Sequence, residues 1–108
     1  MKFGLKTQDL EFIIKTIFEF PEIEKAAIFG SRAKGTYKPG SDIDIAIFGE
    51  SVSFNTISKL QTILEEESPM PYFIDIFDYD HSDSKDLKAH VDRVGITIYE
   101  KAGTIPSK

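Results

Sequence analysis

The sequence has no cysteine and no tryptophan among its 108 residues, and only two histidines. Without cysteine it can form no disulfide, zinc–thiolate site or thiol nucleophile, so a reducing cytoplasm is the expected setting. No apolar run approaches the roughly 20 residues of a membrane-spanning helix. Lys6, Asp9 and Glu11 interrupt the region in which a signal peptide would be apolar. These absences favour a cytoplasmic protein with no membrane partner.

Positive charge is also in the minority. The chain has 13 Lys and Arg residues against 18 Asp and Glu residues, which gives a formal net charge of −5. This acidic balance argues against a protein that binds nucleic acid through bulk electrostatics, so direct nucleic-acid binding is not expected. The length and the 41% hydrophobic share are typical of one globular domain with one core. We therefore expect residues 1–108 to form a single domain.

Hydrophobic periodicity predicts seven elements in the order α-β-β-α-β-α-β. Apolar residues recur at helical spacing over three segments: 8–18, 54–64 and 84–94. Phe54, Ile57 and Leu60 belong to the apolar stripe of the second segment. Thr7 and Ser53 are suited to cap the first two helices, and Gly95 follows the third as its C′ residue. Four segments have the length and composition of strands: 25–29, 41–48, 72–77 and 96–99.

The expected fold class is α/β (α+β), a two-layer sandwich. Strands joined by a loop can pair antiparallel and strands joined through a helix can run parallel, so we expect a mixed sheet of about four strands. Ile43, Ile45 and Ile47 alternate with Asp42 and Asp44 along one strand. The helices are expected to cover the isoleucine face. The other face then carries the carboxylates and the active site.

Three aspartates are expected to share that open face. Asp42 and Asp44 are two residues apart on one strand, and Asp75 alternates with the core isoleucines of another. Two carboxylates about 4 Å apart repel by about 4 kcal/mol at an effective dielectric constant of roughly 20. Divalent cations neutralise such a cluster, and carboxylate oxygens suit Mg²⁺. Any one of these residues alone is most simply a surface aspartate, and Asp78 or Asp80 would replace Asp75 if the register differed.

A glycine-containing loop leads directly into Asp42. Gly30 has no Cβ to block the approach of a ligand, and Ser31 can begin a short helical turn whose free N–H groups face an anion. Three basic side chains add positive charge in this loop: Arg32, Lys34 and Lys38. The loop is not a Walker A motif, because Gly35 is not followed by Lys and Ser or Thr. Its position predicts phosphates beside the aspartates.

The spacing of Gly30-Ser31, ten further residues and Asp42-Ile43-Asp44 resembles the signature of the DNA polymerase β-type nucleotidyltransferase superfamily. The longer string GSRAKGTYKPGSDIDIAIFG is similar to the minimal nucleotidyltransferases, the MNT proteins that are paired with HEPN proteins in toxin–antitoxin modules. The resemblance extends over most of the chain. Its glycine–serine and Asp-x-Asp core is highly specific, whereas the match at Asp75 is less so.

The resemblance implies a set of roles. Gly30 and Ser31 would hold the nucleotide phosphates, with Arg32 and Ser41 as further nucleotide-binding residues of the motif. The catalytic residues Asp42, Asp44 and Asp75 would bind two Mg²⁺ ions, and whether Asp75 also deprotonates the acceptor stays open. ATP would be the substrate. AMP would pass to a tyrosine of a HEPN toxin, so that the chain acts as an antitoxin within a hetero-oligomer. The larger members have an extra domain for the acceptor, which favours an acceptor brought here by a partner.

Two other functions remain open at this point. One is a binding module that neutralises a HEPN toxin by contact alone. The other is a transferase that acts on RNA or on a small molecule. Neither His81 nor His90 has a second histidine at ligand spacing, so we expect neither to bind a metal. Three phenylalanines share the parity of the aspartates and could line a pocket, contact a partner or pack within the fold: Phe48, Phe73 and Phe77.

Overall fold

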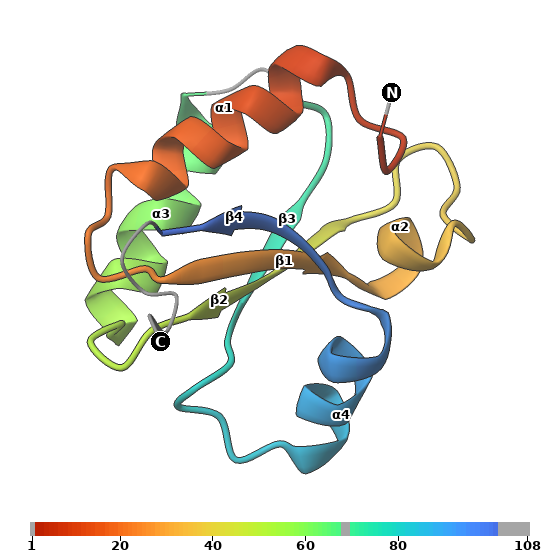
Figure 1. The fold of residues 1–108 in the computed structure, drawn as a ribbon. Helices are drawn as coiled ribbons and strands as arrows, with labels where there is room; N and C mark the ends of the chain where they lie inside the picture. Colours follow the sequence, from red (N-terminus) through yellow and green to blue (C-terminus); the bar gives the residue numbers. More distant parts are fainter. Residues whose placement is uncertain (1, 68–69, 102–108) are drawn as a thin grey trace.

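The computed structural model describes residues 2–67 and 70–101, which contain four helices and four strands (Figure 1). The elements follow one another in this order: α1 (Thr7–Phe18), β1 (Lys25–Phe29), α2 (Gly30–Lys34), β2 (Ile43–Phe48), α3 (Phe54–Glu66), β3 (Ile74–Asp78), α4 (Lys85–Val94) and β4 (Ile96–Glu100). Within these ranges no helix is long and apolar enough to cross a membrane. The domain prediction for residues 1–108 also includes residues outside the described ranges, and it stays a prediction.

The strands form one sheet in the order β3-β2-β1-β4. β1 pairs antiparallel with both β2 and β4, whereas β2 and β3 run parallel. A loop that contains only the short helix α2 joins β1 to β2, while the longer helix α3 lies between the two parallel strands. The predicted mixed sheet of four strands is therefore confirmed.

The main core lies between the isoleucine face of the sheet and the helices α1 and α3. Ile13 and Ile17 of α1 and Leu60 and Leu64 of α3 are fully buried there. The sheet contributes a second set of buried side chains: Ala26, Ile28, Ile43, Ile45, Ile47 and Ile74. Figure 1 shows α1 and α3 on one side of the sheet and α4 on the other. This burial sets the face that each strand residue occupies.

α4 packs against the opposite face of the sheet, whereas the sequence predicts all the helices on the isoleucine face. Its Val91 joins Phe29 and Ala46 in a second buried cluster, with Phe48 and Phe77 partly buried against it. The reason is that this face is apolar away from the aspartates, so it also needs cover. Phe73 takes no such place, because 76% of its surface is exposed.

Several local predictions were wrong. Thr7 does not cap α1: the N-cap is Lys6, without a side-chain hydrogen bond. The short helical turn predicted at Ser31, by contrast, is present as α2. Phe54 is 86% exposed rather than part of the buried stripe of α3. Gly95 is extended (φ −64°) rather than left-handed, and a Cβ there would lie 2.6 Å from the carbonyl oxygen of Val91. A close approach therefore explains Gly95.

Replacement of Ser53 by alanine is expected to destabilise the fold. Ser53 accepts a hydrogen bond from the Thr56 N–H, and the Thr56 hydroxyl closes a capping box at the start of α3. Loss of such a cap costs about 1 kcal/mol. Thr7→Ala is the control, because Thr7 makes no cap, and its effect should be below about 0.5 kcal/mol. Urea unfolding checks both, and equal losses would contradict this assignment of the caps.

Candidate active site

The register of the parallel strands places two aspartates side by side. Asp44 of β2 is opposite Asp75 of β3, within a ladder that also pairs Ile43 with Ile74 and Ile45 with Ile76. Neighbouring strands are about 4.8 Å apart, and Asp42 precedes Asp44 by two residues, or about 6.6 Å along an extended chain. Since Ile43, Ile45 and Ile74 are buried on the opposite face, alternation puts the three aspartates on one face.

These carboxylates interact electrostatically. The pKa of Asp44 is raised from 3.8 to about 6, first by burial and then by the negative charges of Asp75 and Asp42. The guanidinium of Arg32 acts in the opposite direction and lowers it. Asp44 is partly buried, whereas Asp42 and Asp75 are exposed. The fold therefore holds Asp44 in a position where its negative charge is unfavourable unless a cation neutralises it.

The donor set fits a hard divalent cation. All three groups are carboxylates, which suit Mg²⁺, and the raised pKa of Asp44 shows that two of them act on the third. In residues 2–67 and 70–101 no group of three His, Asp or Glu side chains is arranged to hold a metal as it stands. Binding of a metal would require the exposed side chains of Asp42 and Asp75 to adjust.

Gly30 brings the following loop into contact with Asp44. It has a left-handed backbone (φ +73°) at the start of α2. A Cβ built at this position would overlap the Oδ2 atom of Asp44 and would lie 3.2 Å from its Cγ atom. Both the conformation and the close approach therefore call for glycine. Ser31 follows at once, so the glycine–serine pair lies directly beside the carboxylate site.

Arg32 and Ser41 are engaged with each other. Arg32 is only 3% exposed, and its Nε and Nη2 atoms donate to the Ser41 carbonyl oxygen at 3.1 and 2.7 Å. Its Nη1 atom donates to the carbonyl oxygen of Phe3 at 2.8 Å. The Ser41 hydroxyl accepts from the backbone N–H of Lys38 at 2.8 Å. The polar groups of these two predicted nucleotide ligands thus bind the protein's own backbone.

The other acidic candidates lie at the far end of β3. Asp78 pairs in register with Ile47, three positions beyond the Asp44–Asp75 pair, and its carboxylate accepts from His81 Nδ1 at 2.9 Å. This hydrogen bond raises the pKa of His81. Asp80 accepts from the backbone N–H of Gly49 at 2.7 Å. Asp75, and not Asp78 or Asp80, is therefore the neighbour of Asp44.

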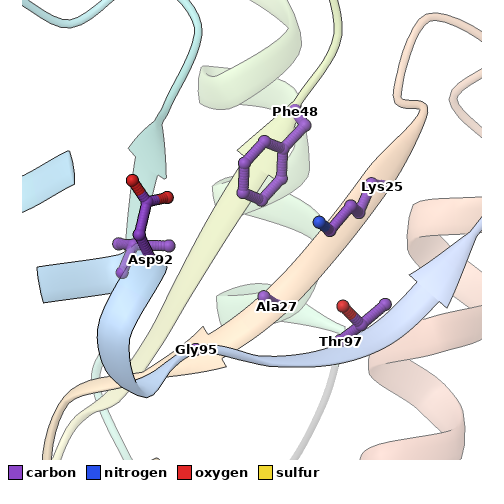
Figure 2. A pocket seen from close by; sticks show the side chains of 7 residues that line it. Lys25, Ala27, Phe48, Asp92, Gly95 and Thr97 are labelled. Carbon is purple, nitrogen blue, oxygen red and sulfur yellow. The ribbon is translucent and has the colours of Figure 1, made fainter. Parts of the chain in front are cut away.

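A small pocket lies on the same face beside the end of α4 (Figure 2). Lys25, Phe48, Asp92 and Thr97 are among the residues that line it, and the Lys25 Nζ atom is 4.7 Å from the centre of the Phe48 ring. Its volume of about 160 Å³ is well below the roughly 300 Å³ at which ligand pockets begin. Phe48 is four residues beyond Asp44, so this pocket is separate from the carboxylates.

The raised pKa of Asp44 predicts a pH-dependent stability in the metal-free protein. The folded state holds the Asp44 proton more tightly than the unfolded chain, so this group's stabilising effect is present below about pH 4 and is lost as pH rises through about 6. Asp75→Asn removes a neighbouring charge and should reduce that loss. Urea unfolding in EDTA across this range compares the two proteins. Identical pH profiles would contradict the coupling of the two carboxylates.

Gly30→Ala should be more damaging than Gly35→Ala. Both glycines have a positive φ, +73° and +82°, and a Cβ at Gly35 would meet no atom within 4 Å. The Gly35 variant therefore carries only the left-handed strain of about 1–2 kcal/mol, whereas the Gly30 variant also displaces Asp44. Urea unfolding gives the two losses, and an equal loss would show that the Gly30–Asp44 contact has no energetic role.

The chain is similar to known proteins in both sequence and fold. The family model described as polymerase beta, nucleotidyltransferase matches residues 11–104. The chain is 34% identical over 104 residues to the probable protein adenylyltransferase MntA of Haemophilus influenzae, covering 94% of this chain and 88% of that protein. The range matched by the family model spans the glycine–serine loop and all three aspartates.

Solved structures share the fold. A chain of a toxin–antitoxin complex with AMP-PNP superposes with a TM-score of 0.70 at 21% identity, over 91% of this chain and 76% of that chain. A chain of the complex between a tri-AMPylated Shewanella oneidensis HEPN toxin and its MNT antitoxin gives 0.69 at 20% identity, over 90% and 74%. With the family model and the Haemophilus relative, these findings show that the chain belongs to the polymerase β-type nucleotidyltransferase family.

Proposed function

We propose that this protein transfers AMP from ATP to a tyrosine hydroxyl of a HEPN toxin, and so acts as an antitoxin in the cytoplasm. The observation that carries the proposal is the pairing of Asp44 with Asp75, with Asp42 on the same face and Gly30-Ser31 alongside. Membership of the nucleotidyltransferase family supports the reaction type. The relative called a protein adenylyltransferase and the neighbour with an AMPylated HEPN toxin support a protein acceptor.

The glycine–serine loop would hold the triphosphate. At Gly30 no Cβ keeps a phosphate away from the backbone, and Ser31, the next residue, would contribute its N–H and hydroxyl. Lys34 and Lys38 are exposed in the same connection and add positive charge near the phosphates. Asp42, Asp44 and Asp75 would hold Mg²⁺. When bound, this ion would neutralise the phosphates and lower the pKa of the attacking hydroxyl.

The strand order supports one direction of approach for the acceptor. The phosphates would lie at the start of α2, which follows β1, while β2 and then β3 lie to one side of β1. The tyrosine oxygen forms a bond to the α-phosphorus as the bond to the bridging oxygen breaks, and pyrophosphate leaves. In-line displacement requires the acceptor to enter opposite the leaving group, on the β3 side. Asp75 is on that side and would accept the hydroxyl proton.

β3 also leaves room for a large acceptor. It is an edge strand of the sheet, and 76% of the surface of Phe73, directly before it, is exposed. A folded partner can approach such an edge without displacing any described element of the chain. This agrees with an acceptor that is itself a protein, as the name of the Haemophilus relative states for that protein.

A binding module without catalysis is the competing function. One observation favours it: the described carboxylates do not form a ready metal cluster. Against it, the fold holds like charges in register at Asp44 and Asp75, and burial together with these charges raises the pKa of Asp44. Binding by contact needs no such arrangement. The two functions differ in whether neutralisation of the toxin depends on these aspartates.

Asp42→Asn and Asp75→Asn should each reduce AMP transfer by at least about 100-fold, because each removes a carboxylate that neutralises charge at the reacting phosphate. Asp78→Asn is the matched control. It lies on the same strand as Asp75 but bonds to His81, so transfer should be retained. The measurement is the label transferred from ATP, radioactive at the α-phosphate, to a purified HEPN protein from the same genome with Mg²⁺.

The outcomes separate the two functions. Loss of transfer together with loss of toxin neutralisation supports catalysis. If Asp42→Asn transfers no AMP but still suppresses the ribonuclease activity of the HEPN protein, the chain works by contact. Full transfer by both Asp42→Asn and Asp75→Asn would show that the active site is elsewhere.

A further inference from the structure

A single side chain connects three segments that are distant in the sequence. The guanidinium of Arg32, on α2, donates two hydrogen bonds to the carbonyl oxygen of Ser41 and one to that of Phe3. Ser41 is the residue before Asp42, and Phe3 lies in the turn that precedes α1. The start of the chain is thus joined through Arg32 to the entry of the strand that carries Asp42 and Asp44.

The surroundings of the guanidinium hold it in place. Arg32 is 3% exposed, and its Cζ atom lies 4.6 Å from the ring centre of Tyr72 and 5.3 Å from that of Tyr37. A buried charge is tolerated when it is hydrogen-bonded and lies against aromatic faces. Its polar atoms are satisfied: among the described residues no buried side-chain nitrogen or oxygen lacks a partner. Three of the five guanidinium N–H groups are thus engaged by backbone carbonyl oxygens, which leaves little of Arg32 for a phosphate.

The N-terminal turn is fitted closely to this arrangement. Phe3 and Gly4 both have left-handed backbones, with φ of 58° and 72°, and the turn is closed by a hydrogen bond of 2.8 Å from the Leu5 N–H to the Lys2 carbonyl oxygen. A Cβ at Gly4 would overlap Cε2 of Tyr37 and lie 3.0 Å from Nη1 of Arg32. A left-handed phenylalanine persists only where its surroundings enforce it.

The backbone position of Asp42 depends on these contacts more than that of Asp44 does. Asp44 lies within the β2 ladder and is held by pairing with both Phe29 and Asp75. Asp42 precedes the first residue of β2, Ile43, and is exposed. The ladder therefore leaves its backbone less restrained on the N-terminal side. Within the loop the Ser41 N–H donates to the Lys38 carbonyl oxygen at 2.9 Å. The two hydrogen bonds from Arg32 to the Ser41 carbonyl are the restraint that joins this point to α2.

We propose that Arg32, held by the N-terminal turn at Phe3 and Gly4, is a positioning residue that sets the location of Asp42, and that it does not bind the nucleotide. This inference rests on the proposed function, and it replaces the role that the motif resemblance implies for Arg32. The guanidinium of Arg32 already donates hydrogen bonds to the carbonyl oxygens of Phe3 and Ser41. A change at the start of the chain should therefore reach the active site.

Two variants test the proposal, one at Arg32 itself and one in the N-terminal turn. Arg32→Lys keeps the positive charge but cannot bridge the two carbonyls with a planar fork. Gly4→Ala leaves Arg32 intact but forces a methyl group against Tyr37 and Arg32. Gly49→Ala is the control, because a Cβ there would overlap the backbone oxygen of Glu22, a similar clash far from Asp42. Circular dichroism selects a temperature at which all the proteins are folded.

The measurements are kcat and KM for ATP in AMP transfer, and the Kd of AMP-PNP. In both Arg32→Lys and Gly4→Ala, kcat should fall by about 10- to 100-fold, since a misplacement of about 1 Å has effects of this size. KM for ATP and Kd should change by less than about 2-fold, and Gly49→Ala should keep the wild-type kcat. A weaker Kd in Arg32→Lys, with an unaffected Gly4→Ala, would identify Arg32 as a nucleotide ligand and overturn the proposal.

A direct readout keeps this test separate from the proposed function. The amide NMR signal of Asp42 should shift in Arg32→Lys and in Gly4→Ala but not in Gly49→Ala. If wild type transfers no AMP, the proposed function fails and the Asp42 signal still decides the proposal. An unmoved Asp42 signal in both test variants would overturn it, whether or not the protein is an active transferase.

Discussion

The pairing register of β2 and β3 is the constraint on which the site depends. Asp44 and Asp75 are opposite each other because Ile43, Ile45 and Ile74 are buried on the other face. A slip of one residue would turn a whole strand over and expose its isoleucines. Hydrophobic burial therefore holds two like charges together, and the raised pKa of Asp44 is the electrostatic consequence. A cation and a nucleotide are the natural partners of a site built in this way.

The loop between β1 and β2 lies close to the Asp44 carboxylate. Gly30 permits the chain to pass directly over the Asp44 carboxylate, and α2 then turns Arg32 inward towards the carbonyls of Phe3 and Ser41. The exposed lysines of the same connection stay on the surface. One basic side chain of this connection thus binds the protein's own backbone, whereas its basic neighbours face the solvent. Sequence proximity to a phosphate loop does not by itself make an arginine a ligand.

Much of this could be predicted from the sequence because period-2 alternation assigns faces without reference to the rest of the fold. The isoleucine face and the aspartates' shared side follow from it, and the mixed sheet follows from which strands are joined through a loop and which through a helix. Three features could not be found in this way. The Lys6 cap of α1 uses no side chain, the place of α4 depends on cover for Phe29 and Ala46, and the contact of Arg32 with Phe3 joins residues 29 positions apart. Each is decided by tertiary contacts that leave no periodic signal.

The most direct test of the central claim locates the cation itself. Mn²⁺ added with AMP-PNP should broaden the carboxyl NMR signals of Asp42, Asp44 and Asp75 selectively, because paramagnetic relaxation falls steeply with distance from the ion. The signals of Asp78 and Asp80, which bond to His81 and to the Gly49 N–H, should persist. Broadening centred on Asp78 and Asp80, or spread evenly over the surface aspartates, would contradict a metal site built on the Asp44–Asp75 pair.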